Sequence, residues 1–131
     1  MRVAPTDLTT MPIQRILIVD DSPVERHILT ELLTAKGYRI SAATDGTQGI
    51  AMAQHEQPDL IIMDVVMPGI NGFQATRTLH RDAATRDIPV ILCTTKSEET
   101  DKIWGMRQGA SDYVTKPIDA STLLAKIAAL G

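Results

Sequence analysis

Short apolar runs recur along the chain, and each is followed by a longer segment whose apolar residues have helical spacing. The runs lie at residues 15–20, 38–43, 60–64, 89–94 and 111–115. A short apolar run bounded by turn residues is typical of a buried strand. Five strands that alternate with helices predict an α/β fold, a doubly wound parallel sheet with helices on both faces.

Capping residues predict where the intervening helices begin. Ser22 and Glu25 form a capping-box pattern before the first helix, and Asp45 and Gln48 repeat this logic before the second, which is expected to run to about Glu56. The other helices are expected to begin near Asn71, Ser97 and Asp119, and helices are expected to end at Gly37 and Gly109.

Helical spacing then predicts which side chains face the sheet. The stripe of the first helix contains Val24, Ile28, Leu29, Leu32 and Leu33. The third helix carries Phe73, Thr76 and Leu79, and the last one carries Leu123, Leu124, Ile127 and Leu130. The first turn of the fourth helix holds the acids Glu98, Glu99 and Asp101, which suit the positive end of a helix dipole.

Length and composition indicate a single globular domain. The 131 residues fit one domain, expected at 15–131, and the polar, proline-containing residues 1–14 are expected to be a disordered leader. A net charge of −3 argues against a nucleic-acid binder. No apolar run reaches the roughly 20 residues of a membrane span, and no signal peptide is present, so we expect no membrane insertion and a cytoplasmic location. Cys93 stands alone, so no disulfide framework is expected, and it is interpreted as a small buried hydrophobe.

Polar side chains follow four of the five predicted strands. Asp20 and Asp21 follow the first strand, Asp64 ends the third, Thr94 the fourth, and Lys116 comes after the fifth. In sheets of this kind, ligands bind outside the carboxyl ends of the strands, so these groups are expected to meet.

The chemistry of these groups points to a phosphoryl group and a metal. Three crowded carboxylates repel one another, and Mg²⁺, which prefers oxygen ligands, relieves that repulsion. A hydroxyl and an ammonium group can hold phosphoryl oxygens. A carboxylate held in line with a phosphoryl group can act as the nucleophile and become an aspartyl-phosphate.

The segments LIVDDS, LIIMDVVMPGINGF, ILCTTK and YVTKP resemble the CheY-like receiver domain of two-component response regulators. The resemblance covers residues 15–130 and implies a flavodoxin-like (βα)5 fold with strand order 2-1-3-4-5. It also implies Asp64 as the phosphoacceptor, with Thr94 and Lys116 assisting, and Mg²⁺ held by Asp20, Asp21, Asp64 and the Val66 carbonyl. Thr94 and Tyr113 match the switch residues, and Pro117 matches a proline that usually follows a cis bond.

The resemblance further implies a signalling role rather than an enzyme with turnover. A sensor histidine kinase is the expected phosphoryl donor. The surface of the fourth helix, fifth strand and last helix is the expected contact for a downstream effector. The segments DDSPVERH, MPGINGFQATR and ETDKIWGMRQGA are most similar to the stand-alone regulators of twitching-motility chemosensory systems. Since no effector domain follows Gly131, we expect output through another protein, or a role as a phosphoryl sink, from a monomer or weak dimer.

Two positions depart from the best-known chemotaxis member, which has polar and acidic residues there. They are Val66, two residues after Asp64, and Lys96, two residues after Thr94. Because a valine side chain cannot orient a water molecule, we hypothesise that the phosphoryl group is not lost rapidly.

Rival interpretations remain at this point. An aspartate-nucleophile phosphatase should carry a general-acid Asp where this chain has Val66, and an FMN carrier needs a Ser/Thr/Gly-rich loop where it has Asp20 and Asp21. Asp64 alone could be a strand-end cap, Tyr113 could simply pack on the last helix, and Trp104 could be either core-edge packing or a partner contact. The histidines His27, His55 and His80 show no ligand spacing.

Overall fold

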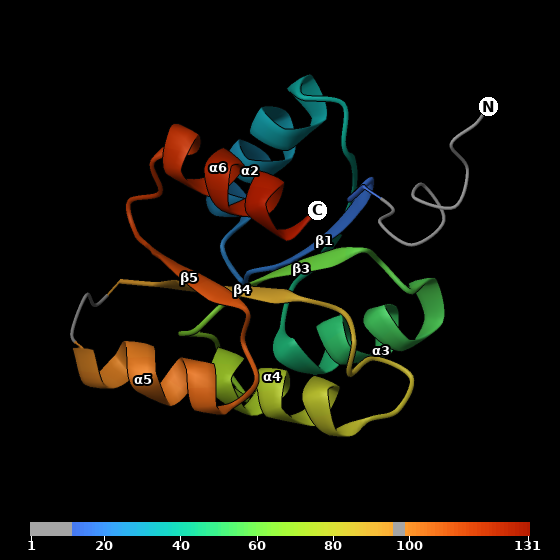
Figure 1. Cartoon of the computed structure of the whole chain (residues 1–131), viewed down its shortest axis with the longest axis vertical. Coiled ribbons are helices and arrows are strands. Elements are labelled where there is room, and N and C mark those ends of the chain that lie inside the picture. Colours follow the sequence, from blue (N-terminus) through green and yellow to red (C-terminus); the bar gives the residue numbers. More distant parts are fainter. Residues whose placement is uncertain (1–11, 96–98) are drawn as a thin grey trace.

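Five parallel strands form one sheet in the order β2-β1-β3-β4-β5, as a computed structural model shows for residues 12–95 and 99–131 (Figure 1). The elements are β1 (Arg15–Val19), α2 (Pro23–Ala35), β2 (Arg39–Ala43), α3 (Gly46–Glu56), β3 (Leu60–Asp64), α4 (Gly72–Arg81), β4 (Val90–Thr94), α5 (Glu99–Arg107), β5 (Asp112–Thr115) and α6 (Ala120–Leu130). The predicted α/β class and strand order are confirmed. The expected disorder of residues 1–11 and the expected cap at Ser97 lie outside the described residues.

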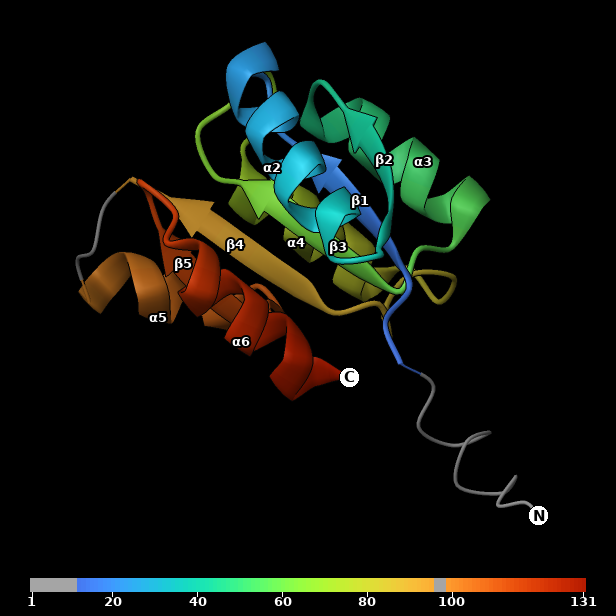
Figure 2. The ribbon, with the colours of Figure 1, turned by 90° about the horizontal axis from the view of Figure 1, so that it is seen from above.

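Two apolar layers hold the helices on opposite faces of the sheet. Helices α2 and α6 lie on one face, and α3, α4 and α5 lie on the other (Figures 1 and 2). Alternate residues of one strand enter different layers: Ile16 and Ile18 pack with α2 and α6, whereas Leu17 and Val19 pack with α3 and α4. Side chains on a strand point alternately to either face, so a sheet covered on both sides needs continuous apolar runs, as the sequence has.

The predicted stripe of α2 is too wide. Leu29 and Leu33 are buried, but Val24 and Ile28 are 65% and 53% exposed. At 3.6 residues per turn the five predicted positions span roughly half the helix circumference, and one face of a sheet covers less than that. Val24 and Ile28 lie at the end of this arc that faces away from the sheet.

Neither of the two expected capping boxes, at Ser22 and Asp45, is complete, whereas α4 has a complete one that was not predicted. At α4, Asn71 and Gln74 each accept a hydrogen bond from the backbone N–H of the other. At α2, Ser22 accepts from the Glu25 N–H, but its own N–H donates to Asp20. The Asp20 carboxylate thus accepts the hydrogen bond from the Ser22 N–H that the Glu25 side chain would accept in a complete capping box.

Positive φ angles mark the predicted helix ends at Gly37 and Gly109, and a further one marks the end of α3. Gly37 and Gly109 have φ of 95° and 107°, and Gln57 ends α3 with φ of 53°. No helix in the described part of the chain is long and apolar enough to cross a membrane.

Candidate functional site

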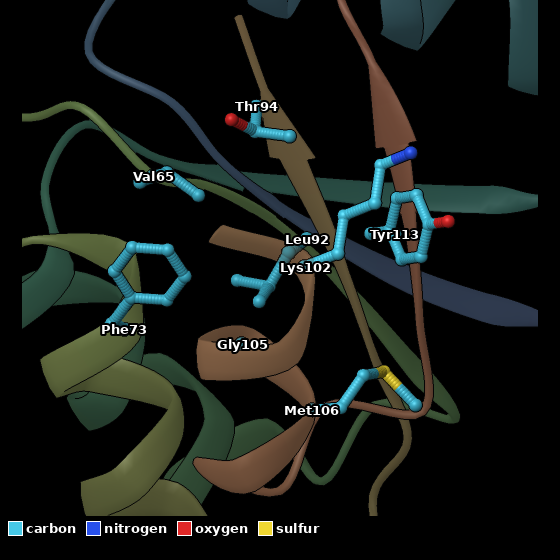
Figure 3. Close-up of a pocket in the computed structure, with 8 residues that line it drawn as sticks. All are labelled: Val65, Phe73, Leu92, Thr94, Lys102, Gly105, Met106 and Tyr113. Carbon is cyan, nitrogen blue, oxygen red and sulfur yellow. The ribbon is translucent and has the colours of Figure 1, made fainter. Parts of the chain in front are cut away.

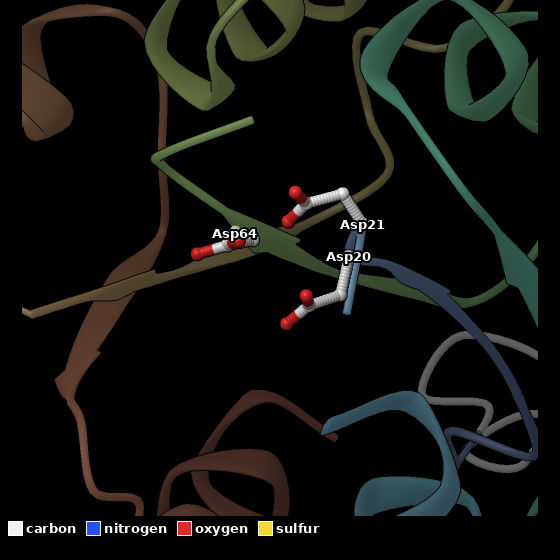
Figure 4. Close-up of side chains that lie close together, drawn as sticks. All are labelled: Asp20, Asp21 and Asp64. Atoms are coloured by element: carbon white, nitrogen blue, oxygen red, sulfur yellow. The ribbon is translucent and has the colours of Figure 1, made fainter. Parts of the chain in front are cut away.

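Three carboxylates converge at the carboxyl edge of the sheet (Figure 4). Asp20 and Asp21 follow β1, and Asp64 is the last residue of β3; one oxygen from each lies within 4.8 Å of the others. Asp20 and Asp64 are only 2% and 6% exposed, whereas Asp21 is open to solvent. Strands β1 and β3 are hydrogen-bonded neighbours, so the sheet itself brings these acids together.

Lys116 brings a positive charge into this cluster from the end of β5. Its Nζ lies 3.2 Å from Asp20 Oδ2 and 3.2 Å from Asp64 Oδ1. Burial alone would lower the pKa of Lys116, but the two carboxylates outweigh it, so that the pKa is raised. The ammonium group therefore stays charged and bridges the two buried acids.

The environment of Asp64 disfavours its ionised form despite that bridge. Burial is the main cause that raises the pKa of Asp64, and repulsion by Asp20 adds to it. Lys116 acts in the opposite direction but does not cancel these effects. The unpaired excess of negative charge makes the cluster a receptive site for a cation.

Local contacts fix the position of Asp20. Its side chain accepts a hydrogen bond of 2.9 Å from the Ser22 N–H. Its carbonyl oxygen accepts one of 2.8 Å from Arg26 Nη1, in the second turn of α2. Sequence reasoning missed Arg26, because its basic side chain gives no sign of a backbone partner six residues earlier.

Gly72 lets the first turn of α4 approach Asp64. A Cβ atom here would lie 2.2 Å from the Asp64 carbonyl oxygen and 2.8 Å from the Val65 Cα. The Gly72 N–H also donates to the Val65 carbonyl over 2.9 Å. The structure therefore requires the absence of a side chain at position 72.

Thr94 ends β4 beside the acidic cluster. The register pairs Asp64 with Cys93, so Thr94 lies one residue further along the neighbouring strand. Its side chain is largely buried, and its carbonyl accepts a 2.7 Å hydrogen bond from the Lys116 N–H. Burial raises the pKa of the Cys93 thiol to about 12, in keeping with a buried hydrophobe.

Thr94 also faces a small apolar cavity that reaches Tyr113 on β5 (Figure 3). The cavity measures about 10 Å³, roughly the space of one water molecule. Its walls include Val65, Phe73, Leu92 and Gly105. A Cβ on Gly105 would lie 2.6 Å from Leu92 Cδ1, so this glycine sets the close approach of α5 to β4.

Tyr113 is half-buried between two lysines at the edge of this cavity. The Nζ atoms of Lys102 and Lys126 lie 5.0 Å and 5.2 Å from the centre of its ring. Lys126 is also paired with Asp112 at 3.0 Å. Tyr113 therefore does more than pack on the last helix, because its ring also borders the cavity and lies close to Lys102.

The other predicted positions are placed as follows. The peptide bond between Lys116 and Pro117 is cis. Val66 is 66% exposed, and this apolar residue occupies the position where an aspartate-nucleophile phosphatase would need an acid. Trp104 is 50% exposed and so is not part of the core. Lys96 lies outside the described residues.

These features define the class of protein. Residues 16–128 match the family described as "Response regulator receiver domain". The chain therefore belongs to the receiver domains of response regulators, a family of signalling domains that bind Mg²⁺ at an acidic site.

Particular relatives are similar over almost the whole chain. Protein PilH of Pseudomonas aeruginosa is 58% identical over 116 residues, which are 88% of this chain and 96% of that protein. Response regulator PleD of Caulobacter vibrioides is 46% identical over 88% of this chain, but the match covers only 26% of PleD.

Solved structures share the fold. Chemotaxis protein CheY4 of Vibrio cholerae has a TM-score of 0.85 at 30% identity, over 91% of this chain and 99% of CheY4. The receiver domain of sensor histidine kinase PA1611 from Pseudomonas aeruginosa PAO1 has a TM-score of 0.80 at 31% identity, over 87% of this chain and 93% of that domain. That structure has a magnesium ion coordinated in its active-site cleft.

Proposed function

We propose that this receiver domain accepts a phosphoryl group on Asp64, and that a sensor histidine kinase is the donor. The observation that carries the proposal is the cluster of Asp20, Asp21 and Asp64 with Lys116 bridging two of them. A carboxylate oxygen of Asp64 attacks phosphorus, the bond from phosphorus to the donor imidazole breaks, and the imidazole leaves with the bonding electrons and takes up a proton.

Mg²⁺ fits the residues present. The three carboxylates, with the Val66 carbonyl as a further proposed ligand, offer the oxygen atoms that this ion prefers. When bound, the ion offsets their mutual repulsion and the charge of the incoming phosphoryl group. Lys116 contributes the second positive charge of the site, and its present bridge to Asp64 gives way to a contact with the phosphoryl oxygens.

We further propose that the added charge is transmitted through Thr94 to Tyr113. Thr94 moves toward the phosphoryl group, and the Tyr113 ring then turns toward the space it vacates. Because the present cavity holds about one water molecule, the ring can enter only if α5 moves away from β4 at Gly105. The surface of α5, β5 and α6 would change in this way and alter its affinity for an effector.

The similarity to PilH supports a role in twitching motility or chemotaxis-like signalling. In this role the domain acts on other proteins and performs no chemistry beyond gaining and losing its own phosphoryl group. The location proposed for it is the cytoplasm, where histidine kinases have their phosphoryl-transfer domains.

Labelling of single-site variants tests the proposal. The protein is incubated with acetyl phosphate or a phosphorylated kinase, with and without Mg²⁺, and its intact mass is measured. We expect one phosphoryl group on the native chain, none on Asp64→Asn, and loss of labelling when Mg²⁺ is chelated. Asp87→Asn, which removes an exposed acid outside the cluster, is the matched control. Labelling of Asp64→Asn at the native rate would refute the proposal.

A further inference from the structure

Helices α4 and α5 lie side by side and share a basic, aromatic surface that the phosphoryl site does not use (Figure 1). We name it the α4–α5 face. It surrounds an open hollow of about 290 Å³ lined by Arg77, His80, Arg81, Trp104, Arg107 and Gln108. His80 packs close to Gly109, where an added Cβ would meet it at 2.5 Å, so the two helices are held together here.

The charge of this face is opposite to that of the whole chain. The chain carries −3, yet three arginines and no acid line the hollow. Among the side chains of residues 12–95 and 102–131, the ion pairs involve other residues, so Arg77, Arg81 and Arg107 have no carboxylate partner there. Arg77 and Arg81 are four residues apart on one helix, where like charges cost a few tenths of a kcal/mol. Ion pairing within the described part of the fold therefore does not account for these arginines.

The α4–α5 face also contains an aromatic side chain that the rest of the fold leaves half exposed. Trp104, the only tryptophan of the chain, is 50% exposed. On the other flank of α5, Ile103 and Met106 line a separate hollow and are 46% and 45% exposed. A half-exposed tryptophan beside arginines is the residue combination that dominates the binding energy of protein interfaces.

We infer that the α4–α5 face binds an acidic segment of a partner protein, with an apolar side chain of that segment against Trp104 and its carboxylates on Arg77, Arg81 and Arg107. The guanidinium group binds carboxylates in a two-point geometry, which gives such a contact its specificity. The face is formed in the structure without a phosphoryl group on Asp64, so binding is tested on the unphosphorylated protein.

Charge favours a protein over a nucleic acid as the occupant. A nucleic acid needs a basic stripe that follows its phosphates, and this chain offers three clustered arginines on an otherwise acidic molecule. An acidic protein segment needs only a local patch of this kind. The hollow on the other flank of α5, between Lys102 and Tyr113, shares Arg107 with it, so both flanks of α5 can engage partners.

Trp104 makes the inference directly measurable. An amphipathic peptide of Glu and Leu is titrated into the full-length protein, and the fluorescence of Trp104 is followed. We expect saturable binding that weakens at least about tenfold in the double variant Arg77→Gln/Arg81→Gln, a loss of about 1.4 kcal/mol. The matched control Lys36→Gln/Arg39→Gln removes the same charge from exposed positions elsewhere and should bind as the native protein does. Thermal unfolding verifies that both variants fold.

Several results would overturn the inference. These are the absence of saturable binding, an equal loss in both double variants, and tighter binding of a Lys–Leu peptide of the same pattern. Tighter binding of a single-stranded DNA oligonucleotide, lost in Arg77→Gln/Arg81→Gln, would assign the face to nucleic acid instead. Concentration-dependent dimerisation that this variant abolishes would assign it to a second copy of the chain.

Discussion

The acidic cluster at the sheet edge and the surroundings of α5 are built in opposite ways. At the cluster, Asp20 and Asp64 are buried, bridged by Lys116 and positioned by the neighbouring strands β1 and β3, which are hydrogen-bonded to each other. Around α5, Ile103 and Trp104 are about half exposed, and Gly105 makes the close contact with β4. The first region is fixed by tertiary packing before any ligand arrives. The second region has little apolar contact to lose, so it can move at low cost.

The largest expected effect tests the close packing of the first region. Gly72→Ala places a Cβ 2.2 Å from the Asp64 carbonyl oxygen, and we expect it to lower the free energy of unfolding by about 3 kcal/mol or more. Gly37→Ala is the control: Gly37 has φ of 95° but no atom within 4 Å of its Cβ position, so it should cost only about 1 kcal/mol. If urea unfolding gave the same loss of unfolding free energy for both variants, the backbone around position 72 would be able to shift and accommodate a Cβ atom.

The next prediction concerns the excess charge of the cluster. Asp64→Asn removes a carboxylate whose ionisation burial and Asp20 disfavour, so the variant should be more stable than the native protein at pH 7, by on the order of 1 kcal/mol. Mg²⁺ should stabilise the native protein and have a smaller effect on Asp64→Asn. Thermal unfolding with and without Mg²⁺ measures both, and a variant less stable than the native protein in the absence of the ion would contradict this account.

A third prediction concerns the lifetime of the phosphoryl group. Val66 is exposed, lies two residues after Asp64 and cannot orient a water molecule, so Val66→Asn should speed the loss of the phosphoryl group several-fold, roughly 1 kcal/mol in activation free energy. Val24→Asn changes another exposed valine and should leave the rate unchanged. The rate is measured as the decay of labelled protein after the donor is removed. If Val66→Asn lost its phosphoryl group no faster than the native chain, the hypothesis would be wrong.

A smaller effect is expected from the second region. Ile103→Ser alters a side chain that is 46% exposed and should change the free energy of unfolding by no more than about 0.5 kcal/mol. The same substitution at the fully buried Ile91 should cost several kcal/mol. A large loss at Ile103 would show that α5 is anchored more firmly than its exposure indicates.

The last prediction concerns a pH dependence of stability at α6. Hydrogen bonds from Ser121 and Thr122 lower the pKa of Asp119, the N-cap of α6. A carboxyl group with a pKa lower in the folded than in the unfolded state stabilises the fold above its unfolded pKa, and this stabilisation is lost as the pH falls through the folded pKa. Asp119→Ala should therefore lower Tm by a few degrees at pH 7 and by less near pH 3. A deficit that is constant with pH would mean that the charge of Asp119 plays no part.

Some features followed from local patterns alone. The apolar runs predicted a parallel sheet because strands covered on both faces must be apolar throughout. The acids and Lys116 could be assigned to one edge because all carboxyl ends of parallel strands meet there. The helix start at Asn71 and the helix ends at Gly37 and Gly109 also depend on neighbouring residues only, so they were predictable.

Other features needed the folded chain, because they depend on which surfaces meet. Helical spacing could not tell that the sheet covers Leu29 and Leu33 but leaves Val24 and Ile28 in solvent. It could not place Arg77 and Arg107, thirty residues apart, beside one hollow, nor set Gly72 against the backbone of Asp64. The sequence by itself determined the fold class and the charged residues that meet at the sheet edge, because both follow from the order of apolar runs and the residues that end them. The tertiary structure alone decided which side chains stay exposed and which charges lack partners, because burial is a property of two surfaces and not of one segment.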